Sequence, residues 1–275
     1  RSLWFYLHNI QAAHKAGCKV QMYGCGIGPV LREQHRKLAA RVLNACVDVI
    51  TLREPDSQKE LQSMGVTRPE VLLTADPALT LPAASDDEID SVLLRAGIPP
   101  RGNYLCFALR NWKGFESKAP LFGQAAKYAY ETYGLTPVFA AVEKHLDPGA
   151  GRLAAAGLDI PHYFLDDAGS AGTIIGALSR MQAVVSMRLH ALIFAAGQGI
   201  PLAGVVYDPK VSSFLRYIGQ ENFADLDALT PDLLKSMIDR VAAAPISPEE
   251  QEAAVRKLRQ TEQVNVETAR RLLGV

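Results

Sequence analysis

Short apolar runs alternate with helix-like segments along most of the chain. In the helix-like segments apolar residues recur three or four positions apart, whereas the short runs are continuously apolar and end at glycine, proline or polar residues. This alternation predicts parallel β-sheets covered by α-helices. The predicted strands are residues 19–23, 48–52, 71–74, 104–109, 137–142, 163–165, 183–187 and 202–206. The predicted helices are residues 3–16, 32–45, 54–65, a short one after 86, 119–133, 149–156, 171–180, 189–198, a short one after 211, 231–243 and 248–272.

A linker divides the two series of elements. Residues 83–101 combine an acidic cluster, a short helix and a Pro/Gly-rich end, a composition typical of a linker. The sequence therefore predicts an α/β protein with two Rossmann-like domains, residues 1–98 and residues 99–247. This is the architecture of GT-B glycosyltransferases, whose active site lies in the cleft between the domains.

The sequences at the two ends of the chain both give information about the first domain. The last helix, within residues 248–275, carries apolar residues among Arg, Glu and Gln, so it needs a surface to pack on, and we expect it to cross back to the first domain. The chain starts at Arg1 rather than Met, directly in a helical pattern, and the first sheet is short of strands. We therefore expect that preceding residues are missing from this sequence.

The amino-acid composition excludes several classes of function. Among the 275 residues, 29 Lys and Arg balance 29 Asp and Glu, so no basic excess is available for broad nucleic-acid binding, although a small cationic site remains compatible. The four cysteines form no metal-ligand or redox pattern, and each lies in or beside an apolar run, which predicts buried, reduced thiols in a cytoplasmic protein. No apolar stretch reaches the ~20 residues that a membrane helix needs.

Polar residues at the carboxyl ends of predicted strands are the candidates for chemistry, because ligands bind there in open parallel sheets. Arg188 and His190 follow the strand at 183–187, at the start of a helix whose free N–H groups favour an anion. A single His near a helix terminus is usually structural. Together with Arg188 in an otherwise apolar segment, however, His190 favours a binding or catalytic site.

Three further strand ends carry weaker candidates, each with a structural alternative. Lys210 and Asp208 follow the strand at 202–206, where Asp-Pro is also typical of a turn. Asp76 follows the strand at 71–74, where it could equally cap the next turn. Arg110 follows the strand at 104–109 and could bind substrate or close the edge between the domains.

Arg53 follows the strand at 48–52, and an ion pair with Glu54 or Asp56 is the structural alternative for it. The preceding loop, GCGIGP at residues 24–29, is not a dinucleotide-binding fingerprint, and a tight turn is the favoured interpretation. The candidates concentrate positive charge and include neither a metal cluster nor an activated Ser or Cys nucleophile. They therefore suggest a small anionic substrate, handled by electrostatics and proton transfer.

Five segments occur in the order seen in polysaccharide pyruvyl transferases, and the sequence resembles the CsaB type of bacterial cell-wall enzymes most closely. The resemblance extends over nearly the whole chain, and the fourth and fifth segments are its most specific parts. The segments are GCGIGP at 24–29, TLREPDS at 51–57, TADPA at 74–78, SMRLHALIFA at 186–195 and YDPKV at 207–211.

The resemblance implies a GT-B-like fold and the transfer of a pyruvyl group from phosphoenolpyruvate, a co-substrate, with no cofactor or metal. The acceptor would be an N-acetylmannosamine of a lipid-linked precursor, and the product a 4,6-ketal that marks secondary cell wall polymers for S-layer anchoring. By resemblance His190 binds phosphoenolpyruvate and is a candidate acid. Arg53 and Lys210 map onto donor-binding positions, and the second domain, residues 99–247, would be the donor-binding domain.

Other consequences of the resemblance concern partners and absent segments. A lipid-linked acceptor would bring the enzyme to the inner face of the membrane, where basic residues of the last helix could contact anionic lipid, although interspersed acids favour a solvated face. An oligomer is compatible with the sequence. The family's N-terminal glycine-rich segments are absent here, so a base for the sugar hydroxyl is not assigned. A nucleotide-sugar glycosyltransferase and a two-domain anion-binding protein remain the alternatives.

Overall fold

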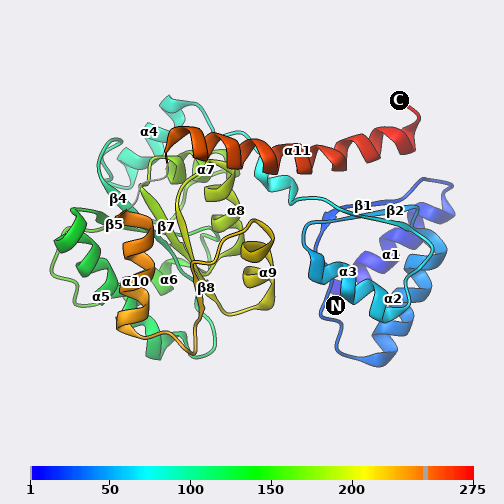
Figure 1. The fold of residues 1–275 in the computed structure, drawn as a ribbon, viewed down its shortest axis with the longest axis horizontal. Helices are drawn as coiled ribbons and strands as arrows, with labels where there is room; N and C mark the ends of the chain where they lie inside the picture. The colour runs from blue at the N-terminus through cyan, green and yellow to red at the C-terminus, as the bar shows by residue number, and fades with distance from the viewer. Residues whose placement is uncertain (1, 244–246) are drawn as a thin grey trace. The chain divides into compact units, whose positions relative to one another are not determined.

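The computed structural model describes residues 2–243 and 247–275. The chain divides into two compact units, Arg1–Leu79 with Lys257–Val275, and Thr80–Arg256. Each unit contains one parallel sheet with helices against it (Figure 1). Both units therefore have the α/β organisation that the alternating pattern predicted.

The sheet of the first unit has three parallel strands in the order β1-β2-β3. Its strands are β1 (Gln21–Cys25), β2 (Val49–Leu52) and β3 (Glu70–Leu73). Its helices are α1 (Ser2–Lys15), α2 (Glu33–Cys46), α3 (Pro55–Met64), the 3₁₀ helix η1 (Pro77–Thr80) and the second part of α11 (Pro248–Leu273).

Local sequence sets the limits of these elements. Helix α3 begins at Pro55, whose missing N–H costs nothing in the first turn, and it ends at Gly65 in the left-handed conformation with φ of 80°. Helix α11 is held by Asn265, which is fully buried. The Asn265 side chain donates to the Ala75 carbonyl at 2.9 Å and accepts from Thr74 Oγ1 at 2.9 Å. The last helix thus packs on the first unit, as its apolar face predicted.

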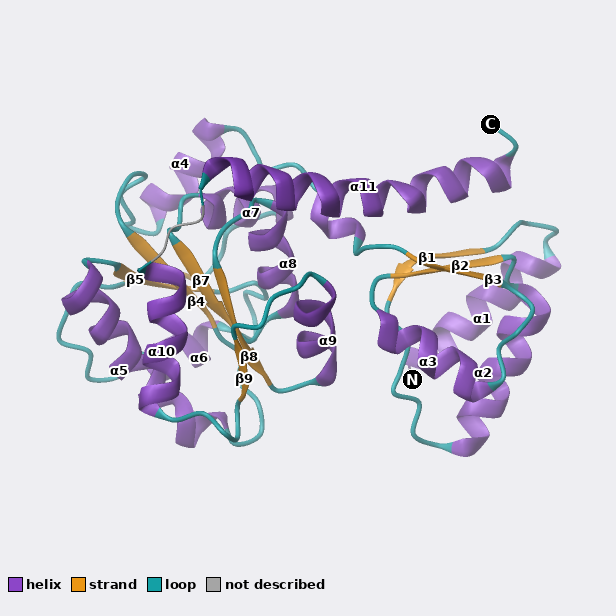
Figure 2. Cartoon of the chain, viewed as in Figure 1, coloured by secondary structure: helices purple, strands orange, loops and turns teal. Residues whose placement is uncertain are grey.

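The sheet of the second unit has six parallel strands in the order β6-β5-β4-β7-β8-β9 (Figure 2). Its strands are β4 (Tyr104–Ala108), β5 (Thr136–Ala140), β6 (Tyr163–Leu165), β7 (Ala183–Ser186), β8 (Leu202–Val206) and β9 (Phe223–Asp225). Its helices are α4 (Asp86–Arg95), α5 (Phe115–Tyr133), α6 (Pro148–Ala154), α7 (Ala171–Ser179), α8 (Leu189–Gly197), α9 (Pro209–Tyr217) and α10 (Pro231–Ala242).

The strand order contains a topological switch point between β4 and β7. From β4 the chain proceeds outward through β5 and β6, then returns to the other side of β4 and continues through β7, β8 and β9. The two central strands are buried along their whole length, and their last residues, Ala108 and Ser186, are paired. Ligands of open parallel sheets bind beyond the carboxyl ends of strands at such a point.

The structure differs from the sequence-based expectation in three places. Helix α4 packs on α7, and Ile89 is so close to Gly176 that a Cβ there would overlap the Ile89 side chain. The compact units accordingly divide between Leu79 and Thr80, earlier than the predicted boundary at 98/99. Strand β9 was not predicted. Of the four cysteines, Cys106 is buried but Cys18 is exposed, so the prediction that all four are buried is wrong.

No helix in the described part of the chain is both long and apolar enough to cross a membrane.

Candidate functional site

The loop between β7 and α8 lies at the switch point of the second sheet and carries Arg188. The hydroxyl of Ser186, which is fully buried, accepts a hydrogen bond from the Arg188 N–H at 2.8 Å. This contact helps to hold Arg188 in an extended conformation as the N-cap of α8, and its own side chain makes no cap hydrogen bond. The first N–H groups of α8 form the positive end of a helix dipole, a favourable environment for an anion.

Arg188 is paired with a buried carboxylate, that of Asp147. Arg188 Nε lies 2.9 Å from Asp147 Oδ2, and the Asp147 side chain is only 1% exposed. The same oxygen accepts from the backbone N–H groups of Val142 and Glu143 at 3.2 and 2.8 Å. Burial raises the pKa of Asp147, although these N–H groups and Arg188 oppose the shift. The carboxylate therefore fixes Arg188 to the loop after β5.

The other oxygen of this carboxylate, Asp147 Oδ1, is buried and has no hydrogen-bond partner among the described residues. Most buried polar atoms in proteins have a partner, and leaving one without a partner costs free energy. Asp147 is a residue that the sequence analysis missed. The available signal was an Asp-Pro pair at the start of the helix that follows a strand, because Asp76-Pro77 and Asp208-Pro209 also precede helices.

His190 lies in the first turn of α8 and is exposed. Its ring centroid is 6.0 Å from that of Phe194, one helical turn further along. An exposed imidazole at the positive end of a helix can reach a bound anion. The structure thus places Arg188 and His190 at the start of one helix.

A second cluster of site candidates surrounds Tyr207, which directly follows β8. Arg110 Nη1 donates to the Tyr207 hydroxyl at 2.9 Å, and its guanidinium carbon lies 5.3 Å from the centre of that ring. Lys210 Nζ lies 5.7 Å from the same ring and 3.5 Å from Asp208 Oδ2. Three predicted residues, Arg110, Asp208 and Lys210, are therefore brought together by β4 and β8.

Asp208 also has the structural role that its turn suggested. Its Oδ1 accepts from the Lys210 N–H at 3.1 Å, which caps the N-terminus of α9. Pro209 occupies the first position of that helix. The cap orients the backbone of Lys210, so the turn and the presentation of the lysine are compatible.

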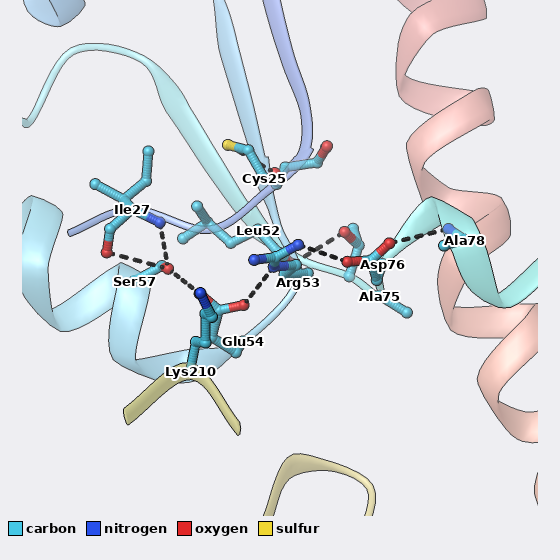
Figure 3. Close-up of polar contacts among 12 residues, drawn as sticks. Cys25, Ile27, Leu52, Arg53, Glu54, Ser57, Ala75, Asp76, Ala78 and Lys210 are labelled. Carbon is cyan, nitrogen blue, oxygen red and sulfur yellow. Dashed lines mark hydrogen bonds and ion pairs between the residues drawn. The ribbon is translucent and has the colours of Figure 1, made fainter. Parts of the chain in front are cut away.

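In the first unit, Arg53 is held between two carboxylates (Figure 3). Its Nε lies 3.1 Å from Glu54 Oε2 and its Nη1 lies 2.7 Å from Asp76 Oδ2. Both acids are buried, and Asp76 Oδ1 also accepts from the Ala78 N–H at 2.9 Å. Burial lowers the pKa of Arg53, but the two carboxylates outweigh burial and the pKa is raised. The structural alternatives for Arg53 and Asp76, an ion pair and a cap, are thus both present.

The glycine loop after β1 approaches this ion-paired group closely. A Cβ on Gly26 would lie 2.8 Å from Glu54 Oε1 and 3.0 Å from Arg53 Nε. The adjacent Ile27 N–H donates to Ser57 Oγ at 2.7 Å, and that hydroxyl donates to Glu54 Oε1. Gly26 is therefore required by a close approach to side chains, in addition to the turn that the sequence indicated.

These contacts change the expected electrostatics. The sequence predicted concentrated positive charge, but each of three predicted cations has a carboxylate partner: Asp76 and Glu54 at Arg53, Asp147 at Arg188, and Asp208 at Lys210. Arg110 contacts aromatic rings and a phenol hydroxyl instead. Arg53 and Asp76 belong to the first unit, and the other five predicted residues belong to the second.

Solved structures with a similar fold are nucleotide-sugar enzymes. UDP-GlcNAc 2-epimerase from Neisseria meningitidis has a TM-score of 0.61 at 11% identity, covering 96% of this chain and 72% of that one. Anabaena Alr3699/HepE, solved with UDP-glucose, has a TM-score of 0.60 at 13% identity over 95% and 74% of the two chains. At this identity the likeness concerns the fold, which is GT-B-like as predicted.

No curated protein shows significant sequence similarity to the chain. The family model for polysaccharide pyruvyl transferase matches residues 1–209, most of the sequence, and includes every predicted site residue except Lys210. The chain therefore belongs to the polysaccharide pyruvyl transferase family and is a transferase.

Proposed function

We propose that the protein transfers the pyruvyl group of phosphoenolpyruvate to an amino sugar and forms a 4,6-ketal. The proposed acceptor is an N-acetylmannosamine of a lipid-linked cell wall polymer precursor. The observation that supports this most is the arrangement at the switch point, where Arg188, fixed by Asp147, and the exposed His190 open the same helix. No cofactor is invoked, because phosphoenolpyruvate itself carries the activated group.

The donor has a phosphate and a carboxylate, and the second unit offers groups for both. Arg188 uses Nε for Asp147, and the terminal nitrogens of a guanidinium suit a phosphate or a carboxylate. The N-terminus of α8 adds backbone donors. Lys210 and Arg110 would supply further positive charge, and Asp208 would act by orienting Lys210.

The chemistry needs one proton at the methylene carbon of the donor. Protonation there produces an oxocarbenium-like centre, which a sugar hydroxyl attacks. Phosphate then leaves, and the second hydroxyl closes the ketal, so that the two hydroxyl protons balance the new methyl C–H bond and the released hydrogen phosphate. We assign the proton donor to His190, since a protonated imidazole can act as a general acid and this exposed histidine lies in the first turn of α8.

The first unit contributes a predicted donor-binding residue, Arg53, and Asp76 beside it. With two carboxylates already at its guanidinium, Arg53 would bind an anion more weakly than an arginine without acidic neighbours. Both roles stay predictions.

A second candidate function is a glycosyltransferase that uses a nucleotide sugar. It is favoured by the structural neighbours, several of which are complexes with UDP or a UDP-sugar. Calorimetry separates the two functions. Heat on titration with UDP-glucose and none with phosphoenolpyruvate would select the glycosyltransferase.

The proposed acceptor would bring this enzyme to the inner face of the cytoplasmic membrane. The product would carry a carboxylate on the polymer, the mark that S-layer anchoring domains would bind.

The direct test is phosphate release from phosphoenolpyruvate with a panel of N-acetylhexosamine glycosides as acceptors, combined with mass spectrometry of the product. We expect phosphate and ketal in equal amounts with an N-acetylmannosamine acceptor. Absence of phosphate release with every acceptor, under conditions where the protein is folded, would reject the function.

A further inference from the structure

A hollow of about 660 Å³ lies beside Tyr207 in the second unit, between the loops after β4, β8 and β9. Trp112 is 41% exposed there, and its ring centroid is 4.8 Å from that of Tyr207. Two exposed carboxylates, Asp225 and Asp227, and the half-buried Asp208 also line the hollow. An exposed tryptophan beside hydrogen-bonding groups in a concave surface is typical of a ligand site.

The charges of the lining argue against an anionic occupant. The lining contains three aspartates and one cation, Lys113, but Asp208 is paired with Lys210, so the remaining formal charge of Asp225, Asp227 and Lys113 is −1. The side of the hollow formed by Asp225 and Asp227 therefore disfavours a phosphate, whereas Arg110 and Lys210 lie at the aromatic side. Within the described residues no group of His, Cys, Asp and Glu side chains could hold a metal ion, so these aspartates do not form a cation site for a metal.

The aromatic faces argue against a cationic organic ligand. The guanidinium of Arg110 already lies 5.1 Å from the centre of the Trp112 ring and 5.3 Å from that of Tyr207, and Lys210 Nζ lies 5.7 Å from Tyr207. An ammonium group stacked on these rings would be repelled by Arg110 and Lys210.

A neutral ring with hydroxyl groups fits both the aromatic face and the carboxylates of the lining. Its C–H face can stack on Trp112, and its hydroxyls can donate to Asp225 and Asp227, which accept hydrogen bonds but cannot donate when ionised. Gly114 adds a backbone without a side chain at the rim, and a Cβ there would lie 4.0 Å from Asp227 Oδ1.

We propose that this hollow is a sugar-binding subsite that holds a neutral ring of the acceptor. As an acceptor site the proposal rests on the proposed function. The contact between Arg110 and Tyr207 links the hollow to the end of β4, at the switch point where the donor is expected. A sugar on Trp112 would therefore lie beside the donor-binding groups of the same unit.

The binding test does not depend on turnover. The chain has two tryptophans, Trp4 and Trp112, so Trp4→Phe leaves Trp112 as the sole tryptophan reporter. Titrating this variant with the methyl glycoside of N-acetylmannosamine should change its tryptophan fluorescence saturably, whereas choline and UDP should not. Saturable binding of choline or UDP with no response to the sugar would overturn the proposal.

The kinetic test compares the two tryptophans. Trp112→Ala should raise the acceptor KM about tenfold and change the phosphoenolpyruvate KM much less, because Arg110 keeps its hydrogen bond to the Tyr207 hydroxyl. Trp4→Ala is the matched control, since Trp4 is 58% exposed on α1 of the first unit, and it should change neither KM. An unchanged acceptor KM in Trp112→Ala would overturn the acceptor assignment.

Asp227→Asn is a milder second variant that keeps the shape of the side chain. It should raise the acceptor KM about threefold through loss of a charge-assisted hydrogen bond, with the phosphoenolpyruvate KM unchanged. A wild-type protein without phosphate release would refute the proposed function, while the fluorescence result would still decide whether the hollow binds sugar.

Discussion

Arg188 Nε lies 2.9 Å from Oδ2 of Asp147, a carboxylate buried to 1% exposure whose other oxygen has no hydrogen-bond partner in the described chain. The pair joins the loops after β5 and β7, on the two sides of the central strand β4. Asp147 therefore fixes Arg188 at the switch point.

Replacing Asp147 should affect both stability and donor binding. Asp147→Ala leaves the Arg188 charge without its buried partner and removes the acceptor for two backbone N–H groups. We expect a loss of about 3 kcal/mol in the free energy of unfolding and an increase in the phosphoenolpyruvate KM. Urea denaturation and initial rates measure the two effects.

Asp147→Asn is the matched variant, because an amide oxygen can still accept the same hydrogen bonds and its nitrogen would replace the oxygen that lacks a partner. It should recover the part of the stability that depends on the two backbone hydrogen bonds. A fully stable Asp147→Ala protein with an unchanged phosphoenolpyruvate KM would contradict the positioning role.

The pH dependence of stability should report the burial of Asp147. Its pKa is raised by burial above the ordinary value of 3.8, so the folded state holds the proton more tightly than the unfolded state. Relative to Asp147→Asn, the wild type should therefore lose stability as the pH rises through the raised pKa.

Asp48 should give the opposite pH dependence of stability. Its pKa is lowered, chiefly by the hydrogen bond from the Val20 N–H at 2.8 Å. Relative to Asp48→Asn, the wild type should lose stability as the pH falls through the lowered pKa. Unfolding in urea between about pH 3 and pH 7 measures both differences. Parallel pH profiles for the two pairs would be incompatible with this assignment.

Gly26 should tolerate no side chain. A Cβ there would come within 3.0 Å of Arg53 and Glu54, which Asp76 and Ser57 hold in place. We expect Gly26→Ala to cost about 1–3 kcal/mol. Gly149→Ala is the control, since a Cβ at Gly149 meets nothing within 4 Å. Equal stabilities of the two variants would show that the loop can move away.

Asp208 combines a helix cap with a contact to Lys210, and the two roles can be separated. Asp208→Ala should cost about 1 kcal/mol through loss of the cap, and its half-exposed ion pair should add little. Thr230→Ala removes a comparable cap, the bond from the Leu233 N–H at 3.2 Å, from α10.

Both variants should lose similar stability, but only Asp208→Ala should change the kinetics with phosphoenolpyruvate. Equal kinetic effects in the two variants would remove Asp208 from the site.

The sequence pattern was sufficient to predict those helices and strands whose ends are marked by residues with strong local backbone preferences. Pro55 and Gly65 mark the limits of α3 because their backbone preferences act within a few residues. Strand β9 escaped prediction because three residues, one of them an exposed aspartate, make no apolar run. The unit boundary was missed because the packing of α4 on α7 is a contact between distant segments.

For the site residues, too, the sequence predicted some features and not others. Strand ends correctly identified where Arg188, Tyr207 and Arg110 would emerge, since parallel strands share one carboxyl edge. The partners of the arginines depend on strand order, which the sequence does not specify. Arg53 therefore pairs with Asp76, 23 residues away, as well as with its neighbour Glu54, whereas Asp56 pairs with Lys59.

The central claim is pyruvyl transfer with His190 as proton donor, and product analysis in D₂O tests it most directly. With phosphoenolpyruvate and an N-acetylmannosamine glycoside, the wild type should release phosphate and form a ketal whose methyl group contains one deuterium. His190→Ala should slow ketal formation about 100- to 10,000-fold, while His8→Ala, which changes an exposed histidine of the first unit, should not. Ketal formation by His190→Ala at the wild-type rate, or phosphate release without a ketal, would contradict the account.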